Sequence, residues 1–152
     1  MMDTEVGSFT VAVFQDVAWA RRGLAALQRH GFSSASLTLL ALATPEAEAL
    51  VSDVQGRPGQ RLEVRGLGTL VGDGPLLRAL NGTAGDFGKL GLTATVRRAG
   101  FQAHDGYIYE TLTSRGGVLV AVEGEARAAD ALSVFHNYGG GNAAIGAWAG
   151  RV

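Results

Sequence analysis

One short stretch of the chain gathers side chains that could transfer protons, namely His104, Asp105, Tyr107, Tyr109 and Glu110. If the stretch is helical, residues three or four positions apart share a face, which places Asp105 beside Tyr109 and His104 beside Tyr107. Such groups can act as general acids and bases when they line a pocket. Tyrosines at this spacing also pack helices against sheets with their hydroxyls reaching solvent, and we favour that interpretation. We therefore assign no catalytic residue and retain His104, Asp105, Tyr107 and Tyr109 as candidate ligand contacts.

A second candidate site lies in a glycine-rich stretch, where Gly72 and Gly74 precede Pro75 and two leucines. A helix that starts after Gly74 would present free backbone N–H groups, which can bind an anion. We therefore predict a small-molecule pocket between this stretch and a sheet, near Gly72, Gly74 and Tyr107.

The residue patterns that bind common cofactors are missing from the sequence. The chain has no cysteine, which excludes disulfides, thiolate metal sites and cysteine nucleophiles. His30, His104 and His136 lie far apart, and we expect His30 and His136 near helix C-termini, where a partly cationic imidazole is stabilised. Gly66 and Gly68 begin a dinucleotide-binding fingerprint whose third glycine is replaced by valine. We expect no cofactor and no metal.

Composition narrows the class of protein. The 152 residues are 47% hydrophobic, which is ordinary for one globular domain, whereas the charged fraction of 18% is low and the net charge is -1. Nucleic-acid binding needs clustered cations, but the basic pairs are Arg21-Arg22 and Arg97-Arg98, which we expect on solvated helix faces. No window of about 20 apolar residues could span a membrane. We therefore expect neither nucleic acid nor membrane as a partner.

The sequence also carries an indication of location. Asp3 and Glu5 stand where a secretion signal would have positive charge, and the lack of cysteine fits a reducing compartment. We expect the protein to be cytoplasmic.

Both ends of the chain show a strand, helix, strand pattern. Residues 8–15 alternate as a strand does, Asp16 can cap a helix that ends at Gly31, and residues 36–43 form a short apolar run. Residues 118–123 are the clearest strand, followed by a helix over 125–138 and a strand over 142–149.

The middle of the chain is less regular. A short helix should start at Pro45 and give way to a loop, and residues 60–65 alternate weakly. Residues 67–80 fit either a strand and a helix or two helical pieces. Residues 86–99 and 102–115 predict two helices, the second ending at Gly116.

These elements predict an α+β fold in a single domain, residues 1–152. Two ferredoxin-like β-α-β units, residues 8–43 and 117–149, flank a Gly-rich, mainly helical insert, residues 56–115. The chain has 23 glycines, many of them in this insert. Glycine in a helix costs about 1 kcal/mol relative to alanine, so we expect it where helices pack closely, within the domain or against a second copy.

Four segments carry a resemblance to a known family: HGFSSASLTLL at 30–40, GPLLRAL at 74–80, YETLTSRGGVLVAVEG at 109–124 and HNYGG at 136–140. In these the chain resembles the bacterial general stress protein family, also called heat-induced stress protein YflT-like, over about residues 8–142. The resemblance implies the fold and a stress-linked role, but no activity. Family members often have a smoother Gly/Ala stretch in the middle, which charged residues interrupt here, and this argues against membrane association.

The leading functional hypothesis is a non-enzymatic, stress-associated protein that acts through self-association. A four-stranded sheet with helices on one face needs cover on the other, which the insert or a second protomer would provide, so we expect a homo-oligomer, with a dimer as the first guess. The alternative is a small-molecule-binding regulatory module with its pocket near Gly72 and Gly74. An enzyme that uses residues 104–110 is the third hypothesis.

Overall fold

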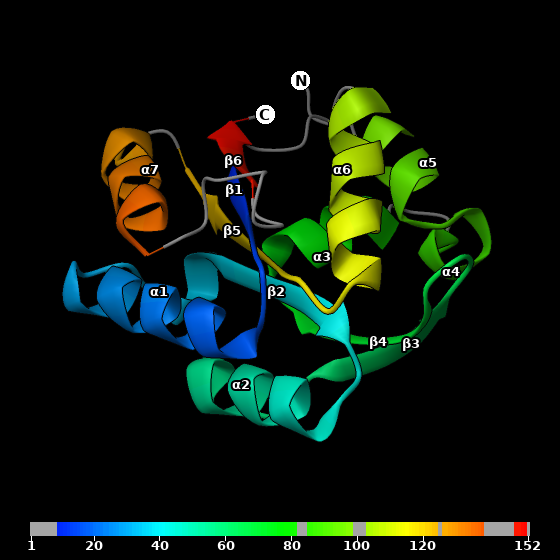
Figure 1. Cartoon of the computed structure of the whole chain (residues 1–152), viewed down its shortest axis with the longest axis horizontal. Coiled ribbons are helices and arrows are strands. Elements are labelled where there is room, and N and C mark those ends of the chain that lie inside the picture. The colour runs from blue at the N-terminus through cyan, green and yellow to red at the C-terminus, as the bar shows by residue number, and fades with distance from the viewer. Residues whose placement is uncertain (1–8, 82–84, 99–102, 125, 139–147, 152) are drawn as a thin grey trace.

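The computed structural model describes residues 9–81, 85–98, 103–124, 126–138 and 148–151 (Figure 1). These residues form an antiparallel sheet of six strands between two layers of helices, which confirms the α+β class. No helix in the described ranges is long and apolar enough to cross a membrane.

The sheet has the strand order β3-β4-β2-β5-β1-β6, and every neighbouring pair is antiparallel. Because β5 lies between β1 and β2, and β1 lies between β5 and β6, the two strand-helix-strand units interleave. The strands are β1 Phe9–Phe14, β2 Leu37–Leu42, β3 Gln60–Val64, β4 Gly68–Asp73, β5 Val118–Glu123 and β6 Trp148–Arg151. The last strand was expected at 142–149, of which 142–147 lie outside the described residues.

Helices cover both faces of the sheet. One layer consists of α1 (Val17–Arg29), α2 (Pro45–Gln55) and α7 (Ala128–Asn137), with the 3-10 turn η2 (Ser34–Ser36) before β2. The other consists of α3 (Pro75–Asn81), α4 (Phe87–Leu90), α5 (Leu92–Arg98) and α6 (Ala103–Ser114).

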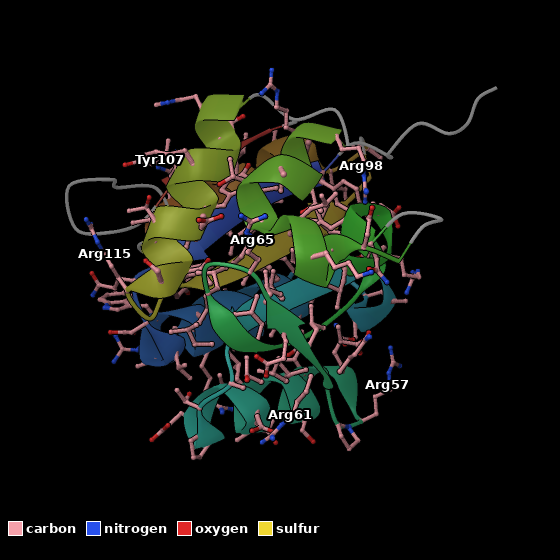
Figure 2. The ribbon with its side chains drawn as sticks, turned by 90° about the vertical axis from the view of Figure 1, so that its right-hand side faces the viewer. Arg57, Arg61, Arg65, Arg98, Tyr107 and Arg115 are labelled. Atoms are coloured by element: carbon pink, nitrogen blue, oxygen red, sulfur yellow. The ribbon has the colours of Figure 1, made fainter. Side chains whose placement is uncertain are left out.

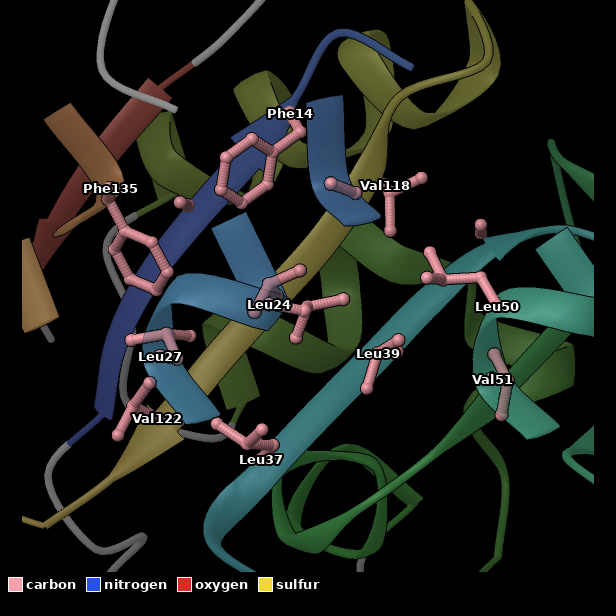
Figure 3. Close-up of a cluster of buried hydrophobic side chains, with 14 of the residues drawn as sticks. Phe14, Leu24, Leu27, Leu37, Leu39, Leu50, Val51, Val118, Val122 and Phe135 are labelled. Atoms are coloured by element: carbon pink, nitrogen blue, oxygen red, sulfur yellow. The ribbon is translucent and has the colours of Figure 1, made fainter. Parts of the chain in front are cut away.

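The first core lies beneath α1, α2 and α7 (Figure 3). Phe14 of β1 meets Phe135 of α7 edge to face, with ring centroids 5.8 Å apart and an interplanar angle of 77°. Gly23 of α1 lies directly against the Phe14 ring, since an added Cβ would be 2.5 Å from Phe14 Cζ. A glycine at this position therefore lets α1 approach the sheet.

The second core uses the alternate residues of the same strands. Phe9, Val11 and Val13 of β1 point to the layer of α3 to α6, whereas Ala12 and Phe14 point to the first core. Strands that are buried on both faces need apolar residues at nearly every position. This explains why β2 is apolar at every position except Thr38.

The insert is mainly helical, as expected, because α3, α4, α5 and α6 lie in it, but it begins with a β-hairpin that the sequence did not clearly indicate. β3 and β4 join the edge of the sheet next to β2; the turn between them contains Gly66 at φ +86°, and Gly68, at φ +89°, begins β4. Residues 67–80 are thus a strand followed by a helix, and α2 is longer than the short helix expected. The helix expected over 86–99 is divided at Gly91, where φ is +86°.

The insert covers the edge strand as well as the second face. An added Cβ at Gly88 would lie 2.4 Å from Glu63 O, and Arg65 N–H donates to Gly88 O at 2.8 Å, so α4 runs against β3. Similarly, an added Cβ at Gly106 would lie 2.4 Å from Val96 Cγ2. The close helix packing expected of these glycines therefore occurs within the domain.

This layer removes the argument for self-association. The hypothesis rested on a sheet face that the insert or a second copy would have to cover, and in the described residues the insert covers it. A homodimer stays a prediction from sequence.

Candidate functional site

The candidate groups on α6 do not converge on one site. His104 and Tyr107 face solvent, and 66% of the Tyr107 surface is exposed, whereas Tyr109 is fully buried in the second core. Burial, and to a lesser degree the charge of Asp105, raises the pKa of the Tyr109 phenol far above its ordinary value of 10.0. The expected proximity of Asp105 and Tyr109 is therefore confirmed, but Tyr109 stays neutral at physiological pH and cannot serve there as a proton acceptor.

The histidines lie in structural positions. His30 follows the last residue of α1, and its Nδ1 is 2.8 Å from Ala26 O, as a helix-terminal role requires. His136 lies in the last turn of α7. No group of three or more His, Asp or Glu side chains that could hold a metal exists within the described ranges.

Gly72 and Gly74 are buried at the junction of β4 and α3. An added Cβ at Gly72 would lie 2.7 Å from Leu39 O. One of the backbone donors expected to bind an anion at the start of α3 is already used, because the Leu76 N–H donates to Thr38 Oγ1 at 2.9 Å. These two glycines thus serve close packing of β2, β4 and α3.

A cleft of about 460 Å³ nevertheless opens beside Gly74, and we call it the hairpin cleft. Its lining residues come from the β3–β4 hairpin, α3 and the region of α4: Gln60, Leu62, Asp73, Gly74, Leu77, Arg78, Asn81, Gly85, Phe87 and Gly88. Asp73 is paired with Arg57, whose Nη2 is 2.8 Å from Asp73 Oδ2. Asn81 Oδ1 accepts from the Phe87 N–H at 3.3 Å. The sequence therefore located this region through Gly74, but Tyr107 does not line the cleft.

A second cleft, of about 750 Å³, is rich in arginine. Two of its arginines, Arg65 and Arg98, are labelled in Figure 2. This arginine cleft is lined by Arg65, Gly66, Leu90, Gly91, Thr93, Ala94, Arg97, Arg98 and Glu110. Sequence reasoning missed it. Arg97 and Arg98 were expected on a solvated helix face, and no local pattern indicates that Arg65, in the hairpin turn, joins them.

Glu110 connects α6 to the start of α5. Its Oε1 accepts from the Thr93 N–H at 3.1 Å and from Thr93 Oγ1 at 2.9 Å. The carboxylate thus satisfies a backbone donor in the first turn of α5, as a capping side chain does.

We expect Glu110→Ala to lower the free energy of unfolding by about 1 to 2 kcal/mol, because the Thr93 donors lose their acceptor. Urea unfolding followed by circular dichroism measures this. Glu123→Ala, which removes an exposed carboxylate, is the control, and equal losses in the two variants would show that the Glu110 contacts contribute nothing.

The fold and the clefts define an α+β domain with ligand-sized hollows in its glycine-rich layer. Comparisons of the chain with family models, curated proteins and solved structures found no match. The resemblance to the general stress protein family stays a prediction from sequence.

Proposed function

We propose that this protein is a non-enzymatic small-molecule-binding module whose site is the hairpin cleft. The observation that carries the proposal is the mixed lining of a cleft of about 460 Å³. Ligand pockets commonly have volumes of roughly 300 to 1,000 Å³, with apolar walls and a few polar groups that orient the ligand.

The lining supplies both kinds of group. Leu62, Leu77 and Phe87 give apolar walls, whereas Gln60, Arg78 and Asn81 bring amide and guanidinium groups. Arg78 is exposed and forms no ion pair with any residue that the structure describes, so its charge is available to a ligand.

A non-enzymatic role is favoured because the acid and base candidates on α6 point apart. A reaction would need a nucleophile or base within hydrogen-bond reach of a partner group in one pocket. Tyr107 is exposed and Tyr109 is buried, and neither lines the hairpin cleft.

For the fold we propose a ferredoxin-like core, made of β2, β5, β1 and β6, that the β3–β4 hairpin extends. The interleaving of the two strand-helix-strand units supports this assignment. A stress-linked and regulatory role would fit such a binding module, and it rests on the sequence resemblance.

Native mass spectrometry of protein purified gently from its own host tests the function. We expect a retained small-molecule mass on the wild type and its loss from Gln60→Trp, because Gln60 lines the cleft and an indole would occupy it. Arg61→Trp is the matched control. Arg61 is the next residue of β3, pairs with Glu48 of α2 and does not line the cleft, so this variant should keep the mass.

Retention of the mass by Gln60→Trp would place the ligand elsewhere and contradict the proposal. A dimer without extra mass would favour the self-association hypothesis instead.

A further inference from the structure

The arginine cleft carries uncompensated positive charge. Arg65 and Arg97 are both exposed and form no ion pair within the described part of the chain. Arg98 is different, because it is paired with Asp86 and its Nη2 donates to Leu80 O at 2.7 Å. The single carboxylate in the lining, Glu110, is engaged by Thr93. Arg65 and Arg97 therefore line the cleft together with one carboxylate, that of Glu110, with which no ion pair forms in the described residues, and the lining keeps a net positive charge.

Contacts of the Arg65 backbone hold this residue in place. Its N–H donates to Gly88 O at 2.8 Å, and an added Cβ at Gly91 would lie 3.0 Å from Arg65 O. The hairpin turn is thus fixed against the junction of α4 and α5. Arg97 lies on α5, the helix that follows this junction. Figure 2 shows Arg65 on the side of the molecule that α5, α6 and the hairpin form.

An apolar surface lies in the same cleft. Leu90 is one of two large hydrophobic residues that are exposed among the described residues, with 41% of its surface accessible, and it lines the cleft with Gly91 and Ala94. A volume of about 750 Å³ is larger than a bare inorganic ion needs. The cleft therefore fits a molecule with a charged end and an apolar body.

We propose that the arginine cleft binds an organic anion, with its carboxylate or phosphate on Arg65 and Arg97 and its apolar part on Leu90. Guanidinium groups donate paired N–H bonds to planar or tetrahedral oxyanions, and such charge-assisted bonds are stronger than neutral ones. This site is separate from the hairpin cleft and goes beyond the function proposed above.

Isothermal titration calorimetry with three probes of one ring system tests the proposal. 1-Naphthoate carries a carboxylate, 1-naphthyl phosphate carries a phosphate, and 1-naphthol is neutral at pH 7.5. We expect at least one of the two anions to bind the wild-type protein more tightly than naphthol, with an affinity that falls as salt is added. The preferred anion distinguishes a carboxylate ligand from a phosphate ligand.

Variants locate the bound anion. Arg65→Gln and Arg97→Gln should each weaken binding by about tenfold, since each removes a charge-assisted contact. Arg115→Gln, which removes an exposed arginine outside the lining, should bind as the wild type does, as should Gln60→Trp in the hairpin cleft. Thermal unfolding checks that the exposed substitutions leave the fold intact.

Equal binding of naphthol and the anions, no binding of either anion, or unchanged affinity in Arg65→Gln and Arg97→Gln would overturn the proposal. None of these results bears on the hairpin cleft, whose test is a retained mass that Gln60→Trp removes.

Discussion

Replacing Gly74 with alanine is expected to lower the free energy of unfolding by about 4 kcal/mol, enough to unfold much of the population of a marginally stable domain. Gly74 joins β4 to α3 with φ at +126°, a conformation that side chains rarely adopt. An added Cβ would lie 2.3 Å from Leu37 O and 2.5 Å from Thr38 Cα. Since both atoms belong to the backbone of a central strand, no rotamer change relieves the clash.

The matched control separates strain from crowding. Gly124 has a similar φ of +118°, but an added Cβ there meets nothing within 4 Å. Gly124→Ala should therefore show backbone strain alone, about 1 to 2 kcal/mol. Urea unfolding of both variants measures the difference, and equal losses would show that contacts of Gly74 with β2 are unimportant.

The parts of the fold that the sequence predicts well are those with local signals. Asp16 was expected to cap a helix, and its Oδ1 accepts from the Trp19 N–H at 2.9 Å. A helix was expected to start at Pro45, and Oγ1 of the preceding Thr44 accepts from the Ala47 N–H at 3.1 Å. Such bonds join residues three positions apart, so residue types in order are sufficient to predict them.

The insert lacks such local information. Residues 60–65 alternate weakly because β3 is an edge strand with α4 against it, and the pairing of β4 with β2 joins segments far apart in the chain. Asp86 precedes α4 without a side-chain capping bond. The division of the expected helix at Gly91 follows from its approach to Arg65, which composition does not reveal.

The candidate sites, too, could be predicted from the sequence only where the signal is local. Helical spacing predicted that Asp105 and Tyr109 are neighbours, but it could not show which side of α6 faces the sheet. The arginine cleft depends on a contact between a hairpin turn and a helix junction, so Arg65 and Arg97 could not be assigned together from their positions in the sequence.

The burial of Tyr109 makes stability depend on pH in the alkaline range. Its folded-state pKa is raised above the unfolded value of about 10, first by burial and then by the charge of Asp105. Below pH 10 the phenol is protonated in both states and the effect is absent. Above pH 10 only the unfolded state releases the proton, so stability falls as pH rises, by about 1.4 kcal/mol for each pH unit until the folded-state pKa is reached.

Tyr109→Phe should remove the contribution of the phenol to the pH dependence of stability. Between pH 10 and pH 12, we expect the free energy of unfolding of the wild type to decrease by roughly 2 to 3 kcal/mol more than that of Tyr109→Phe. Tyr107→Phe, two residues away and exposed, is the matched control and should follow the wild type. Urea unfolding at stepped pH measures all three proteins. If wild type and Tyr109→Phe lost stability in parallel, the Tyr109 phenol would have to ionise in the folded state at its ordinary pKa, which would require water to reach the core beneath α6.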